Sequence, residues 1–378
     1  MKKNKLLLIL FLILLIPNLW ILLSGKLFLY PALYHNFADI DDYEIFHNRE
    51  LKSLNPSPIP SNSEIKSINI SPELEKLLVS LKTTALVVVH NDTFVYEKYW
   101  EDFDKNTISN SFSMTKSIVC ILTGIALKEK LIDNLDMTIG TFLPSFQHTP
   151  KGNIRIRDLL TMSSGLEWDE SYMDPFSVTT EAYYGFDLWK LVSGLEMKEN
   201  PGNLFYYKSC DTQMLTFVLE SITGKKISEY AQEKLWNPIG AEKTALWSLD
   251  HEGGKEKGFC CFSATARDLA RIGMLYLHNG TWKGAQLLDS SFVHKTLSPC
   301  LIKDQNSNPV DYYGMHWWLV SDSVHNFYYA RGILGQYIIC IPEKNVVIVR
   351  LGKIRGLKRG EHPSEVYDLV NEFEHFPR

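Results

Sequence analysis

Ser113-Met114-Thr115-Lys116 stands at the start of an apolar stretch whose spacing predicts a helix running to about Lys130. A hydroxyl and an amine three positions apart lie on one face of a helix, close enough to exchange a proton. Such a pair can activate a serine as a nucleophile without a histidine. The free N–H groups of the first helical turn also favour negative charge beside the serine. Ser113 is therefore the candidate nucleophile and Lys116 its candidate base.

The same four-residue pattern occurs a second time, in Ser63-Glu64-Ile65-Lys66. That copy follows prolines 56, 58 and 60, and its composition is typical of a linker. An isolated S-x-x-K is most often an N-cap serine followed by a solvated lysine. Only the copy at Ser113 precedes a helical stripe that must be buried, so the context separates the two copies.

The N-terminus carries a long apolar segment. Leu6–Leu23 is apolar except for Pro17 and Asn18, and three lysines precede it. Eighteen helical residues span roughly 27 Å, just adequate for the hydrocarbon core of a bilayer. The lysines predict a cytoplasmic N-terminus and an extracytoplasmic body, periplasmic or at the cell surface. A cleaved signal peptide with its apolar core at residues 6–16 is the alternative. Residues 22–25 offer no small-x-small cleavage site, which favours an uncleaved single-pass anchor.

Composition limits the remaining classes. The chain has 378 residues, is 45% hydrophobic and carries a formal charge of −5, which suits a large globular domain. Its charges form no basic stripe, so we expect no nucleic-acid partner. The sequence contains no H-E-x-x-H, no Walker loop and no G-x-S-x-G, and we expect no metal and no cofactor. Cys120 and Cys340 lie in apolar runs and are expected in the core, while disulfides among the other four cysteines stay open.

The order of elements predicts the architecture. We expect an anchor at 1–25, a polar linker at 26–70 and one catalytic domain at 71–378, with a mostly helical lobe inserted at about 131–260. Strand-like runs occur early, at 84–90 and 93–100, and late, at 313–320, 325–330, 336–341 and 345–351. This order predicts an α+β fold, in which one antiparallel sheet, assembled from both ends of the chain, is flanked by helices. Ser113 falls at the crossing from the sheet to the inserted lobe, where a cleft is expected.

A lysine accepts a proton only in its neutral form, which requires burial to lower its pKa. A second proton acceptor near Ser113 would therefore help to activate the serine. A tyrosine that bridges the serine and the lysine is a physically sensible choice, because its deprotonated oxygen accepts the serine proton. Tyr207, in Phe205-Tyr206-Tyr207-Lys208-Ser209, is the candidate. Its neighbour Lys208 points in a different direction and is given no catalytic role.

Several motifs in order resemble those of the serine β-lactamase and penicillin-binding-protein superfamily, in its class C-like branch. They are Phe112–Lys116, Arg157–Leu166, Tyr207–Ser209, Ser263–Leu269 and Tyr313–Trp318. The resemblance extends over about residues 84–375. It implies a β-lactamase/transpeptidase-like fold and a nucleophilic Ser113 assisted by Lys116 and Tyr207.

Within that superfamily the chain resembles the 6-aminohexanoate-dimer hydrolase and carboxylesterase-like group, which favours Y-x-S over Y-x-N. This resemblance implies substrate-binding roles for Ser209 and for Tyr172, a second tyrosine that follows the S-G-L segment. The third superfamily motif, K-T-G or H-T-G, is replaced by Ala330-Arg331-Gly332. Gly332 fits the motif's glycine and lets substrate approach the backbone, and the N–H groups of Ser113 and Ile333 are the expected oxyanion hole. The missing lysine or histidine argues against penicillin and D-alanyl peptide recognition.

The sequence therefore predicts a membrane-anchored serine hydrolase that cleaves a small ester or amide through an acyl-serine intermediate. A β-lactamase or DD-peptidase-type cell-wall enzyme of the same fold is one alternative. A catalytically silent membrane protein that uses the cleft for binding or scaffolding is the other.

Overall fold

The computed structural model describes residues 2–61 and 69–375, so the second S-x-x-K copy at 63–66 lies outside the described residues. The helices are α1 (Lys2–Ser24), α2 (Leu29–His35), α3 (Pro72–Ser80), α4 (Met114–Lys128), α5 (Ile139–Phe142), α6 (Ile156–Leu160), α7 (Val178–Tyr184), α8 (Leu188–Gly194), α9 (Ser209–Thr223), α10 (Ile227–Ala231), α11 (Ala266–Leu277), α12 (Ser290–Thr296) and α13 (Ser364–Phe373). The strands are β1 (Asn48–Leu51), β2 (Thr83–His90), β3 (Thr93–Tyr99), β4 (Ile108–Asn110), β5 (Ala245–Ser248), β6 (Phe262–Thr265), β7 (Thr281–Trp282), β8 (Ala285–Gln286), β9 (Trp318–Ser321), β10 (Asn326–Gly332), β11 (Gln336–Ile341), β12 (Val346–Gly352), β13 (Lys358–Arg359) and β14 (His362–Pro363).

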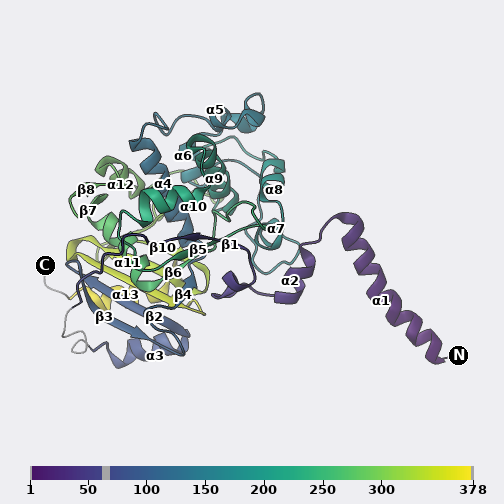
Figure 1. Ribbon diagram of the computed structural model, residues 1–378, viewed down its shortest axis with the longest axis horizontal. Helices are drawn as coiled ribbons and strands as arrows, with labels where there is room; N and C mark the ends of the chain where they lie inside the picture. The colour runs from purple at the N-terminus through teal and green to yellow at the C-terminus, as the bar shows by residue number, and fades with distance from the viewer. Residues whose placement is uncertain (1, 62–68, 376–378) are drawn as a thin grey trace.

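The main sheet is antiparallel and is assembled from both ends of the chain, as expected. Its strand order is β3-β2-β12-β11-β10-β9, so the early hairpin pairs with the late strands through β2 and β12. Successive residues of β2 alternate between two hydrophobic clusters: Val87 belongs to one and Val88 to the other. Helices α4 and α11 pack on one face of the sheet, and α3 and α13 on the other (Figure 1). The alternation of β2 side chains between the two clusters is what a sheet covered on both faces requires.

Helix α11 lies close to the sheet because it has no side chain at Gly273. A Cβ atom there would come within 2.6 Å of Val347 and 2.9 Å of Ile338. Helix α4 is the central helix of the domain, and its residues from Met114 to Ala126 are all buried. It packs between the sheet and the helical lobe, against α9 and β10. Ser113 therefore sits where the two parts of the domain meet.

A second, four-stranded sheet with the order β1-β5-β6-β4 was not expected from the sequence. Its β1 comes from the segment predicted as a linker at 26–70, which also contains α2. Residues Asn48 to Leu51 of β1 pair with residues 245–248 of β5. The segment is thus partly folded onto the body, and the proposed domain limits themselves stay predictions. The late run at 313–320 forms a strand only from Trp318, because His316 has a φ of 59°, which ends extended backbone.

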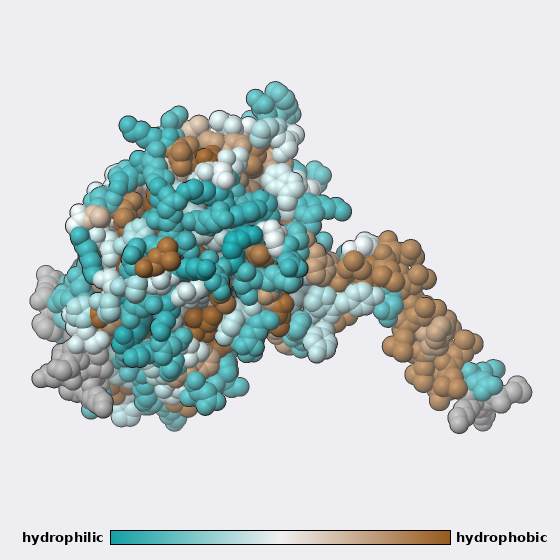
Figure 2. All heavy atoms as spheres, in the orientation of Figure 1, coloured by the Kyte–Doolittle hydropathy of each residue, from teal (hydrophilic) through white to brown (hydrophobic). Residues whose placement is uncertain are grey.

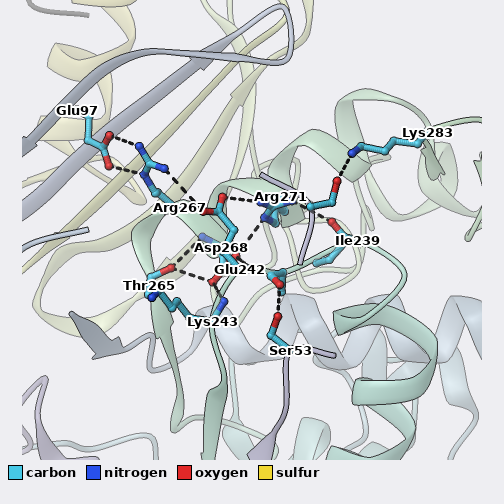
Figure 3. A network of polar contacts seen from close by, with 12 residues as sticks. Ser53, Glu97, Ile239, Glu242, Lys243, Thr265, Arg267, Asp268, Arg271 and Lys283 are labelled. Carbon is cyan, nitrogen blue, oxygen red and sulfur yellow. Dashed lines mark hydrogen bonds and ion pairs between the residues drawn. The ribbon is translucent and has the colours of Figure 1, made fainter. Parts of the chain in front are cut away.

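A network of ion pairs holds the start of α11 (Figure 3). Arg271 and Asp268 are both fully buried and lie 3.1 Å apart, and Arg271 also pairs with Glu242 at 2.7 Å. Arg267 forms two hydrogen bonds with Glu97 of β3. The motif residues Arg267 and Asp268 thus join α11 to β3 and to the loop that precedes β5. Their role in this fold is structural, because removing one of them would take a partner from a buried or half-buried charge.

Helix α1 projects away from the body, and in the part of the chain that the structure describes it alone is long and apolar enough to span a membrane (Figure 1). The stretch that meets this criterion is Asn4–Ser24. Figure 2 shows its surface as almost continuously hydrophobic, in contrast to the mixed surface of the body. Inside it, the Asn18 amide donates to the Leu14 carbonyl at 2.7 Å and accepts from Tyr30 at 2.9 Å. The polar side chain in the apolar helix is therefore hydrogen-bonded.

Candidate active site

Ser113 is presented by a tight turn between β4 and α4. Phe112, which precedes it, has a φ of 47° in the left-handed region that non-glycine residues rarely adopt. The turn is held by two hydrogen bonds: the Phe112 N–H donates to the Asn110 side chain at 3.0 Å, and the Ser111 N–H donates to the Phe262 carbonyl at 3.0 Å. Strain of this kind persists where the surroundings fix it, and it often marks a functional position. Ser113 itself is half-buried, so its hydroxyl can be reached.

Lys116 lies within hydrogen-bond distance of this hydroxyl. Its Nζ is 2.8 Å from the Ser113 Oγ and 2.8 Å from the Phe259 carbonyl oxygen, and only 1% of the residue is exposed. Burial lowers the pKa of Lys116 to about 8, although the charge of Glu170 acts in the opposite direction. A buried amine with this pKa is partly neutral near pH 7, and the neutral form can accept a proton.

Tyr207 completes the group that the sequence predicted. It enters from the loop before α9, close enough to Ser113 for that hydroxyl to act to lower the pKa of Tyr207. Its ring centroid lies 5.2 Å from the Lys116 Nζ and 5.6 Å from the Trp318 ring. Burial raises the pKa of Tyr207 well above its usual value, and the Glu170 charge raises it further. The phenol is therefore protonated at neutral pH, which does not support the tyrosinate expected from the sequence. A neutral phenol can still relay a proton by donating one while it accepts another.

Glu170 is a hub that the sequence analysis did not single out. Its carboxylate accepts hydrogen bonds from the Tyr172 hydroxyl, from the Ser209 hydroxyl at 2.6 Å and N–H at 2.7 Å, and from the Trp168 indole at 2.6 Å. Ser209, predicted to bind substrate, thus already has its hydroxyl bonded to Glu170. Tyr172 is 44% exposed, and desolvation followed by the Glu170 charge raises the pKa of Tyr172 well above its usual value. The carboxylate joins the Tyr172 loop to the start of α9.

The strand that edges the site is β10, which ends at Gly332. A Cβ atom at Gly332 would lie 2.3 Å from the Ser111 carbonyl oxygen, so only glycine fits against the turn that carries Ser113. This close approach brings the next residue, Ile333, beside the same turn. Arg331 lies over the Trp318 ring at 3.3 Å and donates to the Glu361 carbonyl at 2.9 Å. Its positive charge acts to lower the pKa of Tyr207, so it faces the site across the Trp318 ring.

The residues next to Phe259 are joined to each other. A disulfide links Cys260 to Cys261, while Cys120, Cys210, Cys300 and Cys340 are free, and Cys120 and Cys340 are buried as expected. The Phe259 carbonyl that accepts from Lys116 therefore immediately precedes the disulfide-linked pair Cys260–Cys261.

Lys208, next to Tyr207, is buried and donates to the Leu166 carbonyl at 3.1 Å. Within the described ranges no group of three or more His, Cys, Asp or Glu side chains could hold a metal ion.

Comparison with known proteins gives the family. The Beta-lactamase family model matches residues 74–367. The 6-aminohexanoate-dimer hydrolase of Paenarthrobacter ureafaciens is 26% identical over 298 residues, which is 74% of this chain and 75% of that protein.

Two solved structures share the fold. One is a "Putative 6-aminohexanoate-dimer hydrolase" from Bacillus anthracis, with a TM-score of 0.72, 24% identity, and coverage of 90% of this chain and 94% of that one. The other is a family VIII carboxylesterase, with a TM-score of 0.62, 14% identity, and coverage of 81% and 98%. At these identities the likeness concerns the fold alone.

Proposed function

Because this chain belongs to the beta-lactamase family, we propose that it is a serine hydrolase in which Ser113, Lys116 and Tyr207 form the catalytic group. One observation carries the proposal. The Nζ of the buried Lys116 lies 2.8 Å from the Ser113 Oγ, and the Tyr207 ring centroid lies 5.2 Å from the same Nζ. A nucleophile within hydrogen-bond reach of a base, with a third group beside them, is the arrangement that covalent catalysis needs.

In the proposed acylation, neutral Lys116 takes the proton of Ser113, directly or through the Tyr207 hydroxyl. The Ser113 Oγ forms a bond to the carbonyl carbon of the substrate, and the backbone N–H groups of Ser113 and Ile333 donate to the oxyanion. The bond from that carbon to the leaving oxygen or nitrogen then breaks, and Tyr207 passes a proton to the leaving group. The close fit of Gly332 against Ser111 supports this pairing of N–H groups.

Deacylation reuses the same groups. Water loses a proton to Tyr207 and Lys116 and attacks the acyl carbon, and the Ser113 Oγ leaves with that proton as the acid is released. The products are an acid and an alcohol or amine, so one water is consumed in each turnover. No oxidant or cofactor enters this balance.

We assign the substrate to esters or simple amides rather than to penicillins. The strand beside Ser113 reads Ala330-Arg331-Gly332, without the lysine or histidine that precedes the glycine in β-lactam-recognising relatives. The Arg331 guanidinium is already engaged, because it stacks on Trp318 and donates to the Glu361 carbonyl. Tyr172 and Ser209, tied together by Glu170, are proposed to line the side of the site that receives the leaving group.

We further propose that α1 is retained as a single-pass anchor, with the catalytic body on the extracytoplasmic side. Ile21, near the end of α1, is 5% exposed and belongs to the same hydrophobic cluster as the core of the body. Removal of the segment would open that cluster, which argues against cleavage. The Cys260–Cys261 disulfide also suits an oxidising compartment. N-terminal sequencing of the protein from the membrane fraction would recover residues before Ile21, and a mature chain beginning after Ser24 would exclude the anchor.

Turnover assays test the substrate class. The purified full chain is given short p-nitrophenyl esters, the matching anilides, a chromogenic cephalosporin and a D-alanyl-D-alanine peptide. The proposal expects ester or anilide hydrolysis that disappears in Ser113→Ala. Hydrolysis of the cephalosporin or the peptide without ester turnover would favour the cell-wall enzyme. A folded chain inactive on all four substrates would favour the binding protein.

A further inference from the structure

The end of α1 is packed against the body rather than attached by a free tether. Ile21 of α1 and Phe28, Leu29 and Ala32 of the segment that follows are each 5% exposed or less and belong to the main hydrophobic cluster. The Lys26 Nζ lies 5.9 Å from the Trp20 ring. Tryptophan and lysine at the end of a spanning helix collect at the membrane interface. The body is therefore held at a set orientation just above the plane where α1 leaves the bilayer.

The loop at 171–176 lies against this exit point. The ring of Phe176 contacts the ring of Trp20, with centroids 6.1 Å apart. Met173 is 74% exposed and Phe176 is 56% exposed. Large apolar side chains left exposed beside each other on a soluble surface usually mark an interaction site. We call residues 171–176 the exit loop.

Exposed apolar side chains concentrate around the same place. Among the described residues beyond α1, more than half of the exposed large apolar side chains lie in 27–37 and 172–186. They are Leu27, Tyr30, Leu33, Tyr34, Phe37, Tyr172, Met173, Phe176 and Phe186. Figure 2 shows the hydrophobic surface of α1 continuing to the point where it joins the body. A surface that is continuous with a spanning helix has one natural partner, the lipid bilayer.

A groove opens at this surface, between the exit of α1 and the α8 region. It has a volume of about 520 Å³, and its lining mixes the apolar Leu27, Phe186 and Leu191 with the charged Glu181, Asp187 and Lys190. A second groove, of about 370 Å³, shares Leu195 with the first, and its lining combines Phe176 and Trp168 with charged residues, which are Glu167, Asp169, Asp174, Glu196 and Lys198. Both volumes fall in the range of about 300–1,000 Å³ that is usual for small-molecule sites. Their apolar residues extend the exposed surface at the exit of α1 toward the exit loop.

The exit loop also carries a residue of the candidate active site. Tyr172 donates to Glu170, and Glu170 accepts from Ser209 at the start of α9, two positions after Tyr207. The loop that meets the anchor is therefore the loop that borders the catalytic serine. A substrate that reaches Ser113 past Tyr172 comes from the side of the protein that faces the bilayer.

We propose that the exit loop and residues 27–37 form one membrane-contacting surface, and that the site takes acyl esters or amides dissolved in the bilayer. This inference rests on the proposed hydrolase function and anchor, and names the substrate class of the same site. The chemistry is unchanged: the acyl carbon passes from the substrate oxygen or nitrogen to Ser113 and then to water. The long acyl chain stays in lipid, while the carbonyl reaches the nucleophile.

A kinetic experiment separates the inference from the proposed function. The full chain is reconstituted in vesicles of phosphatidylcholine and phosphatidylglycerol and assayed on water-soluble p-nitrophenyl butyrate and on p-nitrophenyl palmitate mixed into the vesicles. The double variant Met173→Ser/Phe176→Ser removes the apolar side chains of the exit loop. The matched control is Val324→Ser, because Val324 is as exposed as Met173, at 73%, but lies in the turn between β9 and β10, outside the proposed surface. The next residue, His325, is hydrogen-bonded to Asn371 of α13.

The expected result is a selective loss. Removing two apolar contacts with lipid should lower palmitate hydrolysis by about tenfold and leave butyrate hydrolysis unchanged. Val324→Ser should change neither rate. Equal palmitate rates for wild type and the double variant would overturn the inference while leaving the hydrolase intact. Absence of butyrate and palmitate turnover in the wild type would overturn the proposed function, and the inference with it.

A second measurement reports on membrane contact without catalysis. Met173→Cys or Val324→Cys is made in a Cys300→Ser background, because the other free cysteines of the described chain are buried. Each new thiol is labelled with an environment-sensitive fluorophore, and the vesicles contain brominated lipid. The label at 173 should be quenched and the label at 324 should not. Equal quenching at both positions would contradict docking of the exit loop.

Discussion

Replacing Lys116 by arginine should remove both most of the activity and its dependence on pH. Burial lowers the pKa of Lys116 from the ordinary 10.5 to about 8. At pH 7 this leaves roughly one tenth of the amines neutral, compared with about three in ten thousand at the ordinary pKa. The gain in proton-accepting amine is about 300-fold, which corresponds to about 3 kcal/mol. Arginine stays charged at any accessible pH, so Lys116→Arg supplies no base at all.

The assay measures kcat/KM for p-nitrophenyl butyrate between about pH 5.5 and about pH 9.5, a range that brackets the expected pKa of Lys116. For the wild type, activity should rise about tenfold per pH unit below pH 8 and level off above it, because the neutral amine is the active form. Lys116→Arg should lose about 10²- to 10⁴-fold and show no rising limb.

A second buried lysine supplies the control. Lys257 donates to the Tyr183 carbonyl at 2.7 Å, and burial lowers its pKa to about 7, so its titration could produce a similar limb. Lys257→Met should keep the rising limb and most of the activity. A limb that survives in Lys116→Arg, or that vanishes in Lys257→Met, would refute the assignment of the base.

Three further variants probe the rest of the structure. Tyr207→Phe should lower kcat by about 10²- to 10⁴-fold with little change in thermal unfolding, since it removes only the relaying hydroxyl, and near-normal kcat would exclude that relay. Gly332→Ala should lower kcat by about 10²- to 10³-fold, because the new Cβ atom would lie 2.3 Å from the Ser111 carbonyl oxygen and would displace the end of β10 together with the Ile333 N–H. Unchanged kinetics would argue against the Ile333 N–H as an oxyanion donor. Asp268→Ala should lower the free energy of unfolding by about 3 kcal/mol, because the fully buried Arg271 then keeps Glu242 as its one remaining carboxylate partner; circular dichroism melts measure this, and an unchanged melting temperature would contradict the structural role.

The main sheet was predictable because its central strands are apolar on both faces and its central helix is largely apolar from Ile118 to Ala126. Residues 84–90 and 345–351 alternate too little to be surface strands, and α4 carries a buried stripe of three turns. The four-stranded sheet was not predictable. Its β1 reads Asn48-Arg49-Glu50-Leu51, which has a single apolar residue, and its partner lies almost two hundred positions away. Pairing of that kind depends on tertiary contact and not on local pattern.

The candidate site divides in the same way. Ser113 and Lys116 lie on one helical turn, so their proximity follows from spacing alone. Tyr207 was placed through resemblance, and its convergence on Ser113 is a property of the folded lobe. Glu170 lies two positions before Tyr172 in an unremarkable segment, and its role as a hub arises from contacts with α9. The Phe259 acceptor is a backbone carbonyl, which no side-chain pattern reveals.

The most direct test of the central claim is to find which serine becomes acylated. The full chain in vesicles is treated with a fluorophosphonate probe, digested, and the modified peptide is sequenced by mass spectrometry. The account predicts a single adduct on Ser113, lost in Ser113→Ala and kept in Ser63→Ala, the matched change in the other S-x-x-K copy. An adduct that persists in Ser113→Ala would contradict it.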